Sequence, residues 1–154
     1  MKIRCDKNME YLTQIFTRAA GIPAEIAEEG PCDVCLLLHV QPKLIHNLPA
    51  GCIIIANADD FSVLRTLEGM GNTIITCGLS GTATITVSSI SDNRFVLCLQ
   101  RKIKTWDGKV VQPQEIPVSV SGISADINQM LLLLSLKLLG GAKEEEKIIL
   151  SGRR

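Results

Sequence analysis

The residues best suited to chemistry in this chain of 154 residues lie in one turn, Asn57-Ala58-Asp59-Asp60. Two carboxylates next to an amide could hold a metal ion or a ribose, because their oxygens accept hydrogen bonds and ligate cations. The same residue types also cap helices and stabilise turns, since their side chains accept bonds from free backbone N–H groups. We favour this structural role for Asp59 and Asp60, and binding is the alternative.

Histidine and cysteine supply weaker candidates upstream of this turn. His39 ends a predicted strand, at the sheet edge where α/β proteins bind ligands, and a catalytic dyad with Cys35 is an alternative that no family signature supports. Cys32 and Cys35 form one Cys-x-x-Cys pair, a spacing used for zinc binding and thiol exchange. Because the pair falls at a strand start, we expect its side chains to point to opposite faces and to be structural, reduced cysteines without a metal.

Composition argues against several classes of function. Sixteen basic and sixteen acidic side chains give a formal net charge of zero, so we expect no nucleic-acid partner, since phosphate backbones attract basic surfaces. Hydrophobic residues make up 46% and aromatic residues 3%, which predicts an aliphatic core. The first residues are too polar for a secretory signal, and no apolar stretch is long enough to span a bilayer. We therefore expect a cytoplasmic protein that does not associate with membranes.

The elements that must position these residues follow from hydrophobic periodicity in the first half of the chain. Short apolar runs bounded by turn formers predict strands buried on both faces, as in parallel α/β sheets. In the helix after the Asn57 turn, we expect Phe61, Leu64 and Leu67 to face inward. The predicted elements are a helix at 7–20, a short helix at 24–29, strands at 32–40 and 51–56, a helix at 60–70 and a strand at 72–77.

After residue 78 the apolar residues alternate, which predicts antiparallel strands with one polar face. Asp107-Gly108 is a strong hairpin signal. The predicted elements here are strands at 82–90, 95–99 and 116–120, a helix at 125–139 capped by Ser124 or Asp126, and a final helix at 143–150. The expected fold is α/β: a short parallel sheet with flanking helices, then an antiparallel β layer and a long closing helix.

This order of elements divides one predicted domain, residues 1–154, into four parts. The parts are an N-terminal helical segment at 1–31, a parallel α/β part at 32–78, antiparallel strands at 79–121 and C-terminal helices at 122–154. Neither a repeat nor a low-complexity linker interrupts the sequence. We therefore expect the candidate residues before and after residue 78 to belong to one fold.

Three motifs in the same order make the chain resemble the central domain of the Mur ligases, the ATP-dependent ligases of peptidoglycan synthesis. The turn Asn57-Ala58-Asp59-Asp60, after the strand at 32–40, is similar to the family's Asn-x-Asp-Asp turn. Residues 73–78 resemble a family strand ending in an aromatic-Gly pair, with Cys77 replacing the aromatic. Residues 122–128 resemble the pattern Gly-x-His-Asn-x-x-Asn and place Asn128 at its last position. The resemblance covers about residues 32–149 and implies that the Asn57 turn lies near a nucleotide.

Departures from the family pattern bear on activity. A phosphate-binding loop of the family type ends in Gly-Lys-Thr/Ser, and no such run precedes residue 32. The family's Mg²⁺-binding glutamate and histidine lack clear counterparts, its His-Asn pair has become Ser124-Ala125, and we expect no C-terminal ligase domain. Lys43 precedes Asn57 at about the spacing of the family's carbamylated lysine, although a solvated lysine is the interpretation we favour. The residual ligand-binding residues that the resemblance and the turn suggest are His39, Lys43, Asn57, Asp59, Asp60 and Asn128.

The apolar run 130–139 predicts a helix buried on several sides. In a domain of this size we expect a homo-oligomer or a protein partner to cover part of it, and a helix between two sheets is the alternative. Our first functional hypothesis is a non-catalytic Mur-ligase-like interaction or regulatory protein, linked to peptidoglycan metabolism by analogy of fold. The alternative is an accessory subunit that completes an ATP-dependent ligase with a P-loop partner, and only then are ATP and Mg²⁺ implied. A weaker third hypothesis is a small-ligand module that uses the Asn57 turn and His39.

Overall fold

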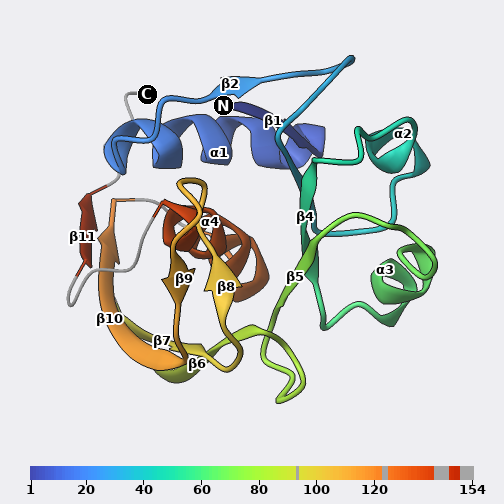
Figure 1. Cartoon of the computed structure of the whole chain (residues 1–154). Helices are drawn as coiled ribbons and strands as arrows, with labels where there is room; N and C mark the ends of the chain where they lie inside the picture. Colours follow the sequence, from blue (N-terminus) through green and yellow to red (C-terminus); the bar gives the residue numbers. More distant parts are fainter. Residues whose placement is uncertain (93, 123–124, 141–145, 150–154) are drawn as a thin grey trace.

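The computed structural model describes residues 1–92, 94–122, 125–140 and 146–149. Within these residues nine strands form one sheet, two more form a small hairpin sheet, and four helices flank them (Figure 1). The strands are β1 (Lys2–Cys5), β2 (Glu25–Ile26), β3 (Val34–Leu37), β4 (Ile53–Asn57), β5 (Ile74–Cys77), β6 (Ile85–Ser91), β7 (Arg94–Leu99), β8 (Ile103–Lys104), β9 (Val110–Val111), β10 (Gln114–Ser121) and β11 (Glu146–Ile149). The helices are α1 (Lys7–Ala19), α2 (Pro42–Ile45), α3 (Phe61–Thr66) and α4 (Ile127–Leu139).

Helices cover both faces of the parallel part of the sheet, as the apolar runs predict. The strand order is β11-β10-β7-β6-β5-β4-β3-β1-β2, and β2 through β6 pair in parallel. In β4, Ile55 packs in the core cluster of α1 and α4, whereas Ile54 packs in the cluster of α2 and α3. Both side chains are fully buried, because successive side chains of a strand point to opposite faces.

The antiparallel strands continue this sheet and do not form the separate layer that we expected. β6 pairs in parallel with β5 at Cys77↔Ile85, and β7 and β10 then follow in antiparallel pairing. The alternation after residue 78 therefore predicted the antiparallel pairing correctly. It could not predict which strand β6 would join, because a period of two describes one strand and not its neighbour.

The apolar helix α4 is covered by the chain itself. In Figure 1 it lies inside the curve of the sheet, beside α1 and the β8–β9 hairpin. The Trp106 N–H donates to the Leu139 carbonyl at 2.9 Å, and Lys137 Nζ donates to the Ala20 carbonyl at 3.1 Å. The composition of α4 therefore does not require a partner, and an oligomer stays a prediction. No described helix is long and apolar enough to cross a membrane.

The N-terminal segment is not purely helical. The helix at 7–20 is confirmed by α1, but the helix predicted at 24–29 is wrong, because β2 lies there and pairs with β1. The Glu25 N–H donates to the Met1 carbonyl at 2.9 Å. This pairing with a distant segment outweighs the local signals, and β2, with only two residues, is too short to show a period.

The C-terminal segment also differs from its prediction. Residues 146–149, expected in a helix at 143–150, form β11 and pair in parallel with β10. Residues 143–145 and 150 lie outside the described residues, as does Ser124. Asp126 caps α4, and its carboxylate accepts from the Gln129 N–H at 2.8 Å while the Gln129 side chain accepts from the Asp126 N–H. The strand β11 gains its stability from β10, a long-range contact that helical spacing does not show.

Candidate functional site

The sheet has a topological switch point between β1 and β3. The chain leaves β1 through α1 toward β2 on one side, and leaves β3 through α2 toward β4 on the other. In open α/β sheets, ligands bind in the crevice outside the carboxyl ends of such strands. Here a side-chain bond bridges that position, since Gln41 Nε2 donates to Asp6 Oδ2 at 2.7 Å.

Asp6 alone connects β1 to α1, and it caps the helix. Its Oδ1 accepts from the Asn8 N–H at 3.2 Å, and the residue is only 6% exposed. The first N–H groups of a helix are where a phosphate would bind. A buried carboxylate therefore lies at the end of α1 that would attract an anion.

The Asn57 turn is built from bonds within the chain. Asn57 is buried, its Nδ2 donates to the Leu38 carbonyl at 3.1 Å, and its Oδ1 accepts from the Asp59 N–H at 3.0 Å. Asp60 caps α3, because its Oδ1 accepts from the Ser62 N–H at 3.0 Å. Asn57 thus ties the end of β3 to the turn after β4, and Asp60 starts the next helix.

Asp59 joins this turn to the loop after β5. Its Oδ2 accepts from the Leu79 N–H at 2.7 Å, and its Oδ1 accepts from the Ser80 N–H at 2.9 Å. Both oxygens therefore bond to backbone, which is the structural role favoured from the sequence. Among the described residues, no group of three or more His, Cys, Asp and Glu side chains is placed to hold a metal ion.

The remaining candidates separate into two places. His39 lies beside Asp60, with Nδ1 and Oδ2 3.4 Å apart and the histidine side chain 62% exposed. Asn128 lies in the first turn of α4, which follows β10. Because β10 runs parallel to β6, α4 begins at the same edge of the sheet as the turns after β3 and β4. Its Oδ1 is buried and has no partner among the described residues. Lys43 lies on α2 and lines a separate cavity.

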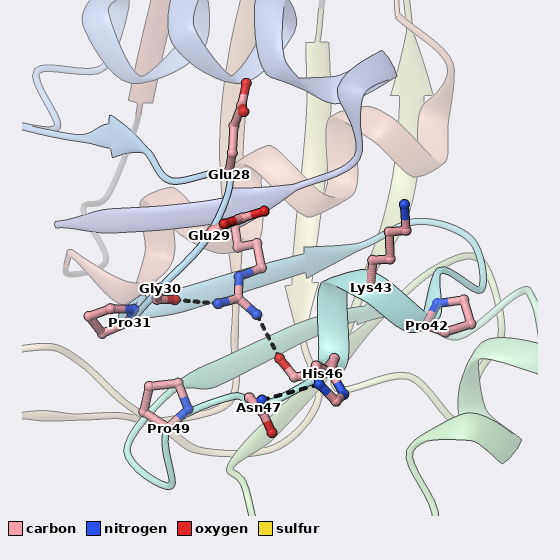
Figure 2. Close-up of a pocket in the computed structure, with 10 residues that line it drawn as sticks. Glu28, Glu29, Gly30, Pro31, Pro42, Lys43, His46, Asn47 and Pro49 are labelled. Atoms are coloured by element: carbon pink, nitrogen blue, oxygen red, sulfur yellow. Dashed lines mark hydrogen bonds between the residues drawn. The ribbon is translucent and has the colours of Figure 1, made fainter.

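That cavity is formed around a residue that the sequence did not single out, Arg4. It has a volume of about 870 Å³. Figure 2 shows its lining, which comes from residues 28–31, from α2 and from the residues after α2. Arg4 is 4% exposed, and its guanidinium donates to the carbonyls of Gly30, Leu44 and His46. A usable signal was the alternation Lys2-Ile3-Arg4-Cys5, which is typical of a strand.

Three cysteines meet on the α2 face of the sheet, contrary to the expectation that Cys32 and Cys35 point apart. Both belong to one core cluster with Cys52, and the Sγ atoms of Cys32 and Cys52 are 3.4 Å apart. The strand begins only at Val34, so strand alternation does not govern Cys32. Burial raises the pKa of Cys35 to about 12, and its thiol contacts the Leu44 carbonyl at 3.7 Å. A protonated, buried thiol is a poor nucleophile, which argues against the Cys35–His39 dyad.

The structure therefore brings together His39, Asn57, Asp59 and Asp60, and places Asn128 at the same edge of the sheet. Lys43 instead faces the Arg4 cavity from α2. No protein-family model matches this chain. A search of the curated proteins also finds no match.

Proposed function

We propose that this chain is a Mur-ligase-like domain without ligase chemistry of its own, which acts as an interaction or regulatory protein linked to peptidoglycan metabolism. The family link rests on the order of the three sequence motifs. The observation that carries the non-catalytic part is the turn between β1 and α1. This turn lies where a phosphate loop lies in P-loop folds, between a strand and the helix that follows it.

Asp6 makes that turn unsuited to nucleotide phosphates. A phosphate loop wraps backbone N–H groups around the anion and needs several residues between strand and helix. Here Asp6 is the single residue between them, and its carboxylate already accepts from the Asn8 N–H and from Gln41. A phosphate at this position would meet a like charge and an occupied N-terminus.

Exposed apolar side chains favour binding of a protein at the same edge. Val40, Phe61 and Leu79 follow β3, β4 and β5, and they are 38%, 70% and 52% exposed. Phe61 was expected to face inward, but Val63 and Leu67 are the buried residues of that segment. We call these three side chains the carboxyl-edge patch. Exposed apolar groups that lie near one another mark interaction sites.

Polar contacts of the Asn57 turn link the loops that carry the carboxyl-edge patch. Asp59 bonds to the Leu79 N–H, and Asp60 contacts His39, the neighbour of Val40. A formal net charge of zero favours contact between copies of the chain. We propose that this patch binds a second copy or a protein partner. In the alternative function, the patch would contact a P-loop subunit that itself holds ATP and Mg²⁺.

The first test is thermal unfolding with and without Mg-ATP. We expect no change in the midpoint, because the β1–α1 turn offers no phosphate site. A ligand present at 100 times its Kd stabilises by about 2.7 kcal/mol, a readily measured change. A Mg²⁺-dependent rise in the midpoint would contradict the proposal and favour the ligase component.

The second test is sedimentation velocity on the double variant Phe61→Ser/Leu79→Ser. We expect the wild-type chain to self-associate as its concentration rises, and the variant to remain monomeric. Val110→Ser is the matched control, because Val110 is also 53% exposed but lies on the β8–β9 hairpin. A wild-type chain that stays monomeric, or a control that behaves like the double variant, contradicts self-association through this patch.

A further inference from the structure

The connection between β2 and β3 leaves part of the sheet without a helix above it. These parallel strands lie on either side of β1, so the connection must cross β1. Such crossovers usually take about a dozen residues or more and contain a helix. Here residues 27–33 make the crossing without one. The crossing therefore covers β1 with a loop, and the cavity of about 870 Å³ lies beside that loop.

Arg4 points to the face of the sheet that this loop crosses. Its neighbours Ile3 and Cys5 belong to the core cluster of α1, and Arg4 pairs in register with Cys35, which belongs to the opposite cluster. The Gly30 carbonyl of the crossing loop accepts from Nη2 of Arg4. The arginine therefore forms part of the cavity wall under the loop, opposite α1.

The guanidinium of Arg4 lacks a counter-charge among the described residues. Leu44 and His46 accept from Nη1 through their carbonyls at 3.1 Å, Nε is buried without a partner, and no described carboxylate lies within 4 Å. A guanidinium has five N–H donors and keeps its charge at any ordinary pH. Burying such a charge without a partner is costly, so buried charges are normally paired.

We propose that this cavity binds a small organic anion whose carboxylate or phosphate group pairs with Arg4. The volume lies in the range of small-molecule pockets and exceeds what a lone oxyanion needs. Pro31, Pro42 and Pro49 give apolar walls for the body of the ligand. Lys43 also lines the cavity, with its ammonium group directed away from Gly30 and His46 in Figure 2. This inference does not depend on the Mur-ligase-like proposal.

The competing explanation is that Arg4 only ties α2 and the crossing loop to β1. Glu28 and Glu29 also line the cavity, and either could neutralise Arg4 after a movement of the loop. Neither forms an ion pair with Arg4 in this structure. The two explanations predict different effects of removing these carboxylates. If the cavity binds an anion, the glutamates repel that anion. If Arg4 is only structural, a glutamate takes the place of the anion.

The direct test is an amide NMR titration of the wild-type chain with benzoate, phenyl phosphate and neutral benzamide at matched ionic strength. We expect saturable shifts at the amides of Gly30, His46 and Asn47 with at least one anion and none with benzamide. A response to phenyl phosphate alone identifies a phosphate head group, and a response to benzoate alone identifies a carboxylate. The proposal is overturned if neither anion shifts these amides or if benzamide shifts them equally.

Variants locate the site within the cavity. Arg4→Lys keeps the charge but loses the planar fork, so we expect the responding anion to bind about tenfold more weakly or worse. Arg94→Lys, at an exposed position on β7, is the matched control and should bind as the wild type does. Unchanged affinity in Arg4→Lys overturns the assignment of Arg4 as the anchor. If that variant does not fold, the wild-type titration with its benzamide control still decides.

The double variant Glu28→Gln/Glu29→Gln separates the two explanations. If a ligand supplies the anion, removing these carboxylates should tighten binding by roughly two- to fivefold, the range for partly exposed charges. If either glutamate is the counter-ion of Arg4, the variant should unfold at a lower temperature and gain no affinity. The second result overturns the proposal.

Discussion

The carboxylate of Asp59 lies less than 3 Å from the position that a Cβ atom on residue 78 would take. An ideal Cβ built on Gly78 is 2.7 Å from Asp59 Oδ1 and 2.8 Å from its Cγ. Only glycine therefore lets this carboxylate reach the N–H groups of Leu79 and Ser80. The glycine is required for close approach of a side chain, since its backbone does not adopt a positive φ.

Gly78→Ala should destabilise the chain by roughly 1–3 kcal/mol, the usual cost of forcing an extra methyl group into a filled space. Urea denaturation measures the free energy of unfolding. Gly81→Ala is the matched control in the same loop, because nothing lies within 4 Å of its Cβ position. In an Asp59→Ala background, Gly78→Ala should lower the free energy of unfolding much less, since the obstructing carboxylate is gone. Equal costs in both backgrounds would contradict this account.

Asp59 and Asp60 should respond differently to the same conservative change. Asp59→Asn loses one of the two acceptors that bond to backbone N–H groups and should cost roughly 0.5–1.5 kcal/mol. Asp60→Asn should stay within about 0.5 kcal/mol of the wild type, because asparagine caps a helix as well as aspartate does. Chemical denaturation of both variants checks this. Similar losses at the two positions would show that the bonds of Asp59 are not the cause.

The buried thiols should make the chain less stable at alkaline pH. Burial raises the pKa of Cys5 from 9.0 to about 11, and burial raises the pKa of Cys35 and of Cys77 to about 12. The folded chain thus keeps protons that an unfolded thiol releases near its ordinary value. The contribution of these three thiols to the free energy of unfolding is complete below pH 9.0. It is lost as the pH rises through their pKa values in the folded chain.

Denaturation under reducing, oxygen-free conditions from about pH 8 to pH 11 measures this loss. Each thiol should contribute up to about 1.4 kcal/mol per pH unit to the fall in unfolding free energy. Because lysine and tyrosine also titrate in this range, Cys35→Ala serves as the reference. Its unfolding free energy should fall less steeply than that of the wild type. Parallel curves would contradict a role for the Cys35 thiol.

Shortening a buried side chain of α4 should lower the free energy of unfolding at every protein concentration. Leu133 is fully buried within the chain, so Leu133→Ala should lose roughly 2–5 kcal/mol of stability, although alanine is itself a good helix former. Val110→Ala, at a residue 53% exposed, is the control and should cost little. Unfolding at low and high protein concentrations should give the same loss. A loss that appears only at high concentration would mean that a second copy covers this helix.

Local signals predicted α1, α3, α4 and the strands β3 to β7 and β10, because the causes of these elements lie within a few residues of one another. The apolar spacing at 7–20 and 125–139 and the caps that Asp60 and Asp126 form are such causes. The Asp107-Gly108 turn between β8 and β9 is another, and Gly108 has the positive φ that a tight hairpin favours. By contrast, β2 and β11 hold their conformation through partners far away in the chain.

The candidate site also has a part that local sequence predicted and a part that it did not. The Asn57 turn was predicted at the end of a buried strand, and its residues lie there. Arg4 was missed, because an arginine that alternates with apolar residues normally faces water. Its burial follows from a crossover too short to carry a helix, which becomes visible only when β2, β1 and β3 are seen in their order.

The sequence by itself determined three helices, α1, α3 and α4, the caps of α3 and α4, the strands β3 to β7 and β10, and the turn that carries paired carboxylates. These features depend on backbone bonds and side chains only a few positions apart. Tertiary structure alone decided that the antiparallel strands extend the parallel sheet, that Cys32, Cys35 and Cys52 meet, and that Arg4 is buried at the wall of a cavity. The physical reason is that strand pairing and burial join segments distant in the chain, and no local pattern specifies which segments will meet.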